Sequence, residues 1–404
     1  MQEIDAILQQ YTAKGKLPCA FGAAVTRENG LVYVGSAGLK DIENPESKVH
    51  NDSVLAFYSC TKAITATALL ILLEDGLVSS IDDPVELYVP DIKEIKVLEK
   101  FDENNKPILV EAKTKATIRH LLTNTAGFSY TLFSSKYKTL QETTGAGNVL
   151  NSTWEDFKTP FIFEPGTKWH YGVGIDWVGK IVYEVSGMSL GDFCKKRIFE
   201  PLGAKSLTFA RDAKQIQESV EIHQRDLIDS SKLTPLRNIP KTEPEFHAGG
   251  QGCYGTISDY MKFLEIFLHD GKSPQTGAQI LRPETVHKYS FTNLLPEGVK
   301  ITNTLEHSDP LLSNVVTFLD DVPADEKGWT ANFYKIYREL PTGRGKNNLS
   351  WAGLSNLYYW IDIERGVAGI FATQLFPFAD PVALAASNDF ETAVYQHLLP
   401  VEDA

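Results

Sequence analysis

The chain of 404 residues has only four cysteines, no long apolar run and no excess of basic residues. The cysteines are widely scattered, which is typical of reduced thiols rather than of a disulfide framework. No apolar stretch approaches the roughly 20 residues that a membrane-spanning helix needs. The formal net charge of −13 opposes binding to nucleic acids and to anionic membranes by repulsion. We therefore expect neither nucleic acid nor a membrane among the partners.

Sequence patterns for metal or cofactor binding are also missing. The chain contains no H-E-x-x-H, no C-x-x-C and no paired Cys/His spacing. The run Gly249-Gly250-Gln251-Gly252 lacks the Lys-Ser/Thr that follows in a phosphate-binding loop. We expect no metal and no cofactor. Residues 1–5 show no basic region followed by an apolar one, so we expect a cytoplasmic protein unless a leader was removed.

The tetrapeptide Ser59-Cys60-Thr61-Lys62 stands in front of a long apolar segment. The apolar residues recur at helical spacing, at Ala63, Ala66, Leu69, Leu70 and Leu73. In a helix, residues three apart share one face, so the Lys62 amine lies one turn from the Ser59 hydroxyl. A serine hydroxyl is a weak nucleophile at neutral pH and needs a base. The pattern predicts a serine nucleophile that is activated by a buried lysine instead of a histidine.

Two other serine patterns compete with this one. Ser135-Lys136-Tyr137-Lys138 also matches S-x-x-K, but it lacks apolar periodicity, and we predict a solvated loop there. Gly187-Met188-Ser189-Leu190-Gly191 matches the G-x-S-x-G nucleophile elbow. The residues before Gly187 have a helical pattern where an elbow needs a strand, so Ser189 is predicted to cap the next helix. Ser59 is therefore the predicted nucleophile.

Further motifs follow Ser59 in a defined order. They are Gly76-Leu77, Asp82-Asp83-Pro84-Val85, Tyr88-Val89-Pro90, the run from Thr117 to Gly127, Glu164-Pro165-Gly166, Trp169-His170-Tyr171 and Gly249-Gly250-Gln251-Gly252. In this order, over residues 15–395, the chain resembles the serine β-lactamase and penicillin-binding-protein superfamily. The likeness is closest to its class C-like branch, with the family VIII carboxylesterases and the fungal statin-pathway acyltransferase.

This resemblance implies roles for individual residues. Ser59 would be the acylated nucleophile, Lys62 its partner, and Tyr171 the tyrosine of the second family motif. A tyrosine there can accept the serine proton or pass one to the leaving group. Both Lys62 and Tyr171 stay open as the general base. By analogy, the backbone N–H groups of Ser59 and Leu354 would form the oxyanion hole.

Two departures from the β-lactamase pattern concern the substrate. Val173 replaces an asparagine two residues after the tyrosine, and Trp351-Ala352-Gly353 replaces Lys-Thr-Gly. The first removes an amide donor, and the second removes the cation that receives a substrate carboxylate. We expect residues 351–353 to form one wall of the site, as in family VIII esterases. The other residues predicted to contact substrate are aromatic, namely Tyr58, Tyr130, Trp169, Tyr254, Trp329 and Phe376.

The pattern of elements predicts an α+β fold. Helices are expected at residues 3–14 and 382–398, and strand hairpins at 20–26 with 31–36 and at 357–363 with 367–373. Both chain ends would thus contribute to one antiparallel sheet flanked by helices, the β-lactamase/transpeptidase-like arrangement. We assign residues 1–75 with 246–404 to an α/β lobe and 76–245 to a mostly helical lobe, forming one catalytic unit with the active site at their interface. The polar stretches 210–245 and 295–345 are expected to be loops around the cleft entrance.

The predicted function is that of a serine esterase or acyltransferase with an acyl-enzyme on Ser59. The partners would be a small-molecule ester or thioester and, for transfer, an alcohol acceptor. One alternative is a β-lactamase or D-alanyl-D-alanine peptidase, in which Arg344 or Lys346 would receive the substrate carboxylate. A second alternative is a non-catalytic binding protein on the same fold. The sequence gives no prediction of the oligomeric state.

Overall fold

The computed structural model describes residues 1–151, 153–237, 244–301, 305–316 and 322–399. Within these ranges seven strands form one antiparallel sheet in the order β2-β1-β13-β12-β11-β10-β9. The strands are β1 (Cys19–Thr26), β2 (Gly30–Gly38), β9 (Lys327–Trp329), β10 (Tyr334–Ile336), β11 (Asn348–Gly353), β12 (Leu357–Asp362) and β13 (Val367–Ala372). β1 pairs with β13, so the two ends of the chain meet in the middle of the sheet. The predicted α+β fold with an antiparallel sheet is confirmed.

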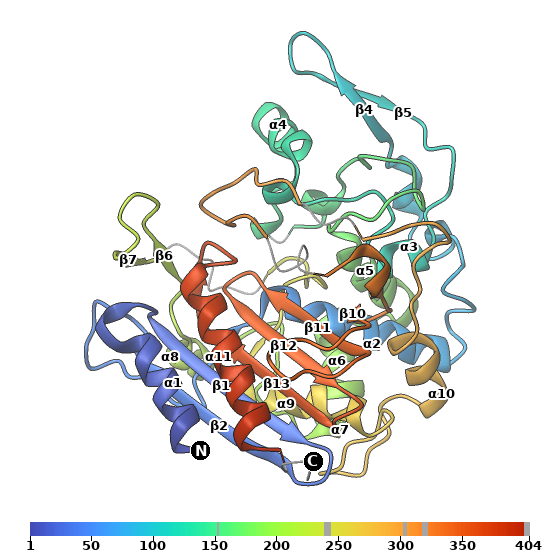
Figure 1. Ribbon diagram of the computed structural model, residues 1–404. Coiled ribbons are helices and arrows are strands. Elements are labelled where there is room, and N and C mark those ends of the chain that lie inside the picture. Colours follow the sequence, from blue (N-terminus) through green and yellow to red (C-terminus); the bar gives the residue numbers. More distant parts are fainter. Residues whose placement is uncertain (152, 238–243, 302–304, 317–321, 400–404) are drawn as a thin grey trace.

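Helices cover both faces of this sheet. α1 (Gln2–Thr12) and α11 (Pro381–His397) lie side by side across one face (Figure 1) and pack their apolar side chains on Trp360 and Phe371. α9 (Ile257–Glu265) packs on the other face, against β1 and β13, and shares a larger core with the helical part of the chain. Because both faces are covered, β1 and β13 are buried along their whole length. This explains their continuous apolar sequences.

The remaining elements lie mostly between β2 and β9 in the sequence. The helices are α2 (Thr61–Glu74), α3 (Ile118–Leu122), α4 (Ser135–Thr144), α5 (Gly174–Ser186), α6 (Leu190–Cys194), α7 (Glu200–Leu202), α8 (Ala213–Glu218) and α10 (Pro283–Thr285). The short strands are β3 (Leu55–Ala56), β4 (Val97–Phe101), β5 (Pro107–Val110), β6 (His223–Arg225), β7 (Leu233–Pro235), β8 (Tyr254–Gly255) and β14 (Leu375–Phe376). α2 packs against α5, and α5 also packs against α3. The division into two lobes at residues 75 and 245 remains a prediction.

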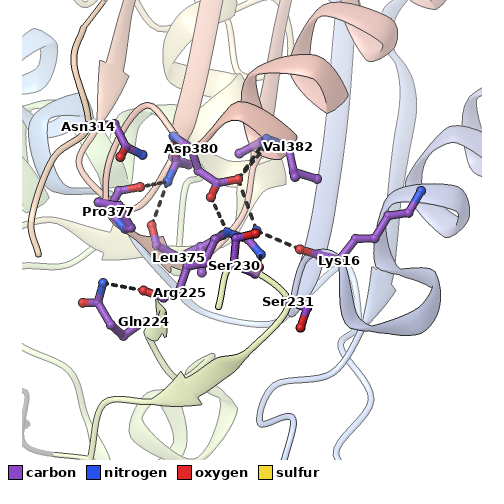
Figure 2. Close-up of polar contacts among 12 residues, drawn as sticks. Lys16, Gln224, Arg225, Ser230, Ser231, Asn314, Leu375, Pro377, Asp380 and Val382 are labelled. Carbon is purple, nitrogen blue, oxygen red and sulfur yellow. Dashed lines mark hydrogen bonds and ion pairs between the residues drawn. The ribbon is translucent and has the colours of Figure 1, made fainter. Parts of the chain in front are cut away.

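A buried ion pair fixes β6 beside the start of α11. The Arg225 guanidinium donates to both carboxylate oxygens of Asp380 and to the carbonyl groups of Lys16 and Ser230 (Figure 2). Asp380 also caps α11, because its Oδ1 accepts two backbone N–H groups of the first turn. These hydrogen bonds offset the cost of removing the two charges from water. The pair therefore holds a segment from the middle of the chain against its C-terminal helix.

The expected terminal elements lie within two residues of the observed bounds, but the polar segments were predicted less well. Residues 135–138 form the first turn of α4 instead of a solvated loop, because Ser134 caps this helix and Tyr137 is buried beneath it. The stretch 295–345 contributes the edge strand β9 and its neighbour β10, and 210–245 contains α8, β6 and β7. Residues 238–243, 302–304 and 317–321 of these two stretches lie outside the described residues.

Two expectations from composition can be compared with the structure. All four cysteines are buried free thiols, as predicted. Among the described helices, none has both the length and the apolar character that crossing a bilayer requires.

Candidate active site

Ser59 lies in a short 3-10 helix, Tyr58–Cys60, that leads directly into α2. Tyr58 has a φ angle of 45°, a left-handed conformation that is uncommon for a residue other than glycine. Its ring packs edge-on against Phe376 at a centroid distance of 5.7 Å, and this contact supports the unusual backbone. α2 is buried from Thr61 through Leu72. A strained turn on a rigid, buried helix thus presents the Ser59 hydroxyl.

Lys62 is buried, with 4 % of its surface exposed. Its Nζ makes three hydrogen bonds, to Ser59 Oγ at 3.2 Å, to the Tyr130 hydroxyl at 2.9 Å and to the Gly250 carbonyl at 2.9 Å. Nζ also lies 4.8 Å from the ring centroid of Tyr171 and 5.1 Å from that of Tyr130. Electron-rich ring faces at these distances stabilise a cation. The structure therefore brings Ser59, Lys62 and Tyr171 together inside the protein.

Tyr171 lies between Lys62 and the sheet. Its hydroxyl accepts a hydrogen bond from Trp351 Nε1 at 3.0 Å, and the two rings are 4.9 Å apart. The phenol that is hydrogen-bonded to Lys62, however, is Tyr130, for which the sequence predicted only a contact with substrate. Burial raises the pKa of Tyr130 well above its usual value, and the nearby Asp176 acts in the same direction. Tyr130 therefore stays protonated at neutral pH and serves as a fixed hydrogen-bonding partner of the amine.

Gly250 and Asp176 are two site residues to which sequence reasoning gave no role. The Gly250 N–H donates to Asp176 Oδ1 at 2.7 Å, while the carbonyl of the same glycine accepts from Lys62. A Cβ atom on Gly250 would lie 2.6 Å from Asp176 Oδ2, so this approach requires glycine. Burial raises the pKa of Asp176 to about 6, and the charge of Lys62 acts in the opposite direction. The available signals were the glycine run itself and an acid, Asp176, among the apolar residues that open α5.

The end of β11 lies against the turn that carries Ser59. A Cβ atom on Gly353 would be only 2.5 Å from the carbonyl oxygen of Phe57 and 3.2 Å from Cys60 Sγ. The absence of a side chain at residue 353 therefore lets the strand approach the turn Tyr58–Cys60 that carries Ser59. Leu354, the predicted second oxyanion donor, follows Gly353 directly and lines the same cavity as Ser59.

This cavity has a volume of about 320 Å³ and is lined mainly by apolar atoms. Eight of the residues predicted for the site line it, namely Tyr58, Ser59, Tyr130, Tyr171, Trp351, Ala352, Gly353 and Leu354. Much of the remaining wall is aliphatic and includes Leu132, Val149, Leu305, Leu312 and Val316. Asp309 also lines the cavity, and its carboxylate lies 3.4 Å from Lys138 Nζ. No lysine or arginine is found among the described lining residues.

Five residues predicted to contact substrate do not line the cavity, namely Trp169, Val173, Tyr254, Trp329 and Phe376. Trp329 packs against Trp351 at a centroid distance of 4.6 Å, and Phe376 packs against Tyr58. Tyr254 lies with Tyr58 in the wall of a separate small cavity. These aromatic side chains support the lining residues from behind.

The competing candidates from the sequence lie elsewhere. α5 ends at Gly187, which has a φ angle of 68°, and Ser189 caps α6 by accepting the N–H of Asp192. The Arg344 guanidinium is bound to the Glu391 carboxylate of α11. Lys346 is exposed, and neither it nor Arg344 lines the cavity. Among the described residues, no cluster of three His, Cys, Asp or Glu side chains is placed to hold a metal ion.

Comparisons with known proteins agree with this geometry. The acyltransferase calJ of Penicillium decumbens is 27% identical over 444 residues, an alignment that covers all of both chains. The lovastatin esterase of Penicillium rubens is 27% identical, with 92% of each chain covered. A mutant structure of simvastatin synthase from Aspergillus terreus superposes with a TM-score of 0.83 at 26% identity, covering 97% of this chain and 94% of that one.

The family comparison covers nearly the whole chain as well. The profile described as "Beta-lactamase" matches residues 4–394. The matched range includes the turn Tyr58–Cys60, Tyr171, the glycine run and the strand that ends at Gly353. The chain therefore belongs to the Beta-lactamase family.

Proposed function

We propose that this protein, whose relatives are acyltransferases and an esterase, moves the acyl groups of neutral carboxylic esters or thioesters through an acyl-enzyme on Ser59. The observation that carries the proposal is the position of Lys62 Nζ, 3.2 Å from the Oγ of Ser59, which lines an apolar cavity. A lysine at this distance can hydrogen-bond the serine hydroxyl as it attacks, and it can accept the serine proton when its amine is uncharged.

In the first half-reaction, Ser59 Oγ attacks the carbonyl carbon of the ester. Its proton leaves to Lys62 or to Tyr171, and the carbonyl oxygen becomes an oxyanion bound by the N–H groups of Ser59 and Leu354. The tetrahedral intermediate then expels the alcohol or thiol, which takes up the proton. Ser59 is left as an ester of the acyl group. The hydrogen bond from Trp351 Nε1 orients the Tyr171 hydroxyl in the site.

In the second half-reaction, water or an alcohol acceptor attacks the acylated Ser59. Water gives an esterase, and an alcohol gives an acyltransferase. The cavity favours transfer to an apolar alcohol, because its aliphatic and aromatic walls bind such an acceptor and leave less room for water. A volume of about 320 Å³ fits a short acyl chain together with part of a larger acceptor.

The β-lactamase or peptidase alternative lacks a cation in the required place. The substrates of those enzymes carry a carboxylate, yet Arg344 is occupied by Glu391 and Lys346 does not line the cavity. The charged group in the described lining is a carboxylate, Asp309, which repels an anion. We therefore expect turnover of nitrocefin to be far slower than turnover of p-nitrophenyl butyrate.

A panel of p-nitrophenyl esters, assayed with and without an alcohol acceptor, tests this function. We expect Ser59→Ala to lower kcat about a thousandfold or more, as removal of a nucleophile does. Ser189→Ala is the matched control and should stay within about threefold of the wild-type rate, because Ser189 is a helix cap outside the cavity. Chromatography of the products separates hydrolysis from transfer. Full activity of Ser59→Ala, or loss of activity in Ser189→Ala alone, would contradict the proposal.

A further inference from the structure

Asp176 is a buried carboxylate that the proposed mechanism does not use. It lies in the first turn of α5 with none of its surface exposed. Oδ1 accepts the N–H of Gly250, whereas Oδ2 is buried without a hydrogen-bond partner among the described residues. An ionised carboxylate in such a place needs compensating positive charge, because one hydrogen bond does not replace its hydration.

Lys62 provides this positive charge from the opposite side of Gly250. The N–H of this glycine donates to Asp176, and its carbonyl accepts from Lys62 Nζ. A Cβ at this residue would lie 2.6 Å from Asp176 Oδ2 and 3.0 Å from the Tyr130 hydroxyl, so the three polar groups surround one small residue. Asp176 and Lys62 are both buried, and in the interior opposite charges attract more strongly than at the surface.

The three hydrogen-bond acceptors of Lys62 are all uncharged, namely a serine hydroxyl, a tyrosine hydroxyl and a backbone carbonyl. Asp176 is thus the carboxylate that balances the ammonium charge. The other titratable groups that act here are Tyr130, which faces both Asp176 and Lys62, and Tyr171, which lies beside Tyr130. Tyr130 stays protonated because burial raises its pKa, so it does not supply this negative charge.

We propose that Asp176 is a positioning residue for acylation, whose carboxylate fixes Gly250 and supplies the counter-charge that keeps Lys62 Nζ beside Ser59. This inference rests on the proposed function. Asp176 would thus act on the nucleophile from α5, three residues after Val173. It does not line the cavity, so it does not contact substrate. Protonation of Asp176 would remove the charge, while its Oδ1 could still accept the Gly250 N–H.

The variant Asp176→Asn tests the proposal, because it keeps the shape and an oxygen acceptor for Gly250 while removing the charge. The matched control is Asp259→Asn on α9, since the buried Asp259 likewise accepts a backbone N–H, that of Ser206, at 2.7 Å. Asp259 does not line the cavity. Each protein is assayed for single-turnover acylation by p-nitrophenyl butyrate from about pH 5 to pH 9, together with KM and the melting temperature.

We expect Asp176→Asn to slow acylation about tenfold or more at pH 8, with KM changed less than about threefold. The wild-type rate should fall as the pH drops through about 6, the pKa of Asp176, and this bend should be absent from the variant. Asp259→Asn should keep both the bend and a rate within about twofold of the wild type. A merely structural role would lower the melting temperature without removing the bend.

The inference is wrong if Asp176→Asn acylates at the wild-type rate throughout, or if it retains the acid bend. If that variant does not fold, the pH dependence of the wild-type acylation rate tests the proposal. A constant rate between about pH 5 and pH 7.5 contradicts the role of the carboxylate, and a bend near pH 6 supports it. Failure of this inference leaves Ser59→Ala inactive. Failure of the proposed function would instead leave Ser59→Ala active.

Discussion

Replacement of Gly353 by alanine tests whether the end of β11 must lie against the turn Tyr58–Cys60. The new Cβ would be 2.5 Å from the Phe57 carbonyl oxygen, whereas real Cβ atoms essentially never come closer than 3.0 Å to another atom. The strand and the turn must then separate by about 0.5 Å, because the contacted atom belongs to the backbone and the interior is close-packed. This shift moves the N–H groups of Ser59 and Leu354 apart. Since misplacement by about 1 Å costs about a hundredfold in rate, we expect kcat to fall about 10- to 100-fold with little change in KM.

Steady-state hydrolysis of p-nitrophenyl butyrate measures both constants, and thermal unfolding shows the cost in stability. Gly187→Ala is the control. Gly187 has a φ angle of 68° and nothing within 4 Å of an added Cβ, so alanine there is strained but distant from the cavity. It should lose about 1–2 kcal/mol of stability and keep the wild-type kcat. A Gly353→Ala protein that is folded and has the kcat of the wild type would refute the argument.

Three further substitutions have defined outcomes. Burial lowers the pKa of His170 to about 4, so the unfolded chain binds more protons than the native chain below about pH 6.5. The free energy of unfolding should therefore fall by up to roughly 3 kcal/mol between pH 6.5 and 4. Urea denaturation of His170→Gln should lack this loss. Arg344→Met leaves the Glu391 carboxylate buried and unpaired, which should cost about 3–5 kcal/mol in the same assay without changing kcat/KM of the folded protein. Trp351→Phe removes the N–H donor of the Tyr171 hydroxyl, and kcat should fall about tenfold at nearly constant KM.

The part of the site that could be predicted from the sequence is the local part. Ser59 and Lys62 are three residues apart, so helical geometry alone brings them together. The other partners of Lys62 are Tyr130 and Gly250, which lie 68 and 188 residues away along the chain. Tyr130 follows α3 and Gly250 lies in the glycine run, and only tertiary packing brings both to Lys62 on α2. No spacing rule connects such distant residues, and for this reason the role of Asp176 was missed.

The difference between local patterns and long-range packing also explains the wrong predictions for the fold and for the cavity wall. β9 and β10 have three residues each, too few for strand periodicity to be recognised. Trp329 on β9 and Trp351 on β11 are both buried aromatic residues whose rings pack together, yet of the two only Trp351 lines the cavity. Composition predicts that aromatic side chains gather near the site. It does not tell which of them forms the first layer and which packs behind it.

The central claim is that an acyl group is carried by Ser59 Oγ, and rapid quenching tests it most directly. The protein is mixed with p-nitrophenyl butyrate, quenched in acid within the first turnover, and analysed by intact mass and by peptide mapping. The mechanism predicts one butyryl group on the peptide that contains Ser59 and none in Ser59→Ala. Turnover of the ester without this adduct, or with the butyryl group on the peptide that contains Ser189, would contradict it.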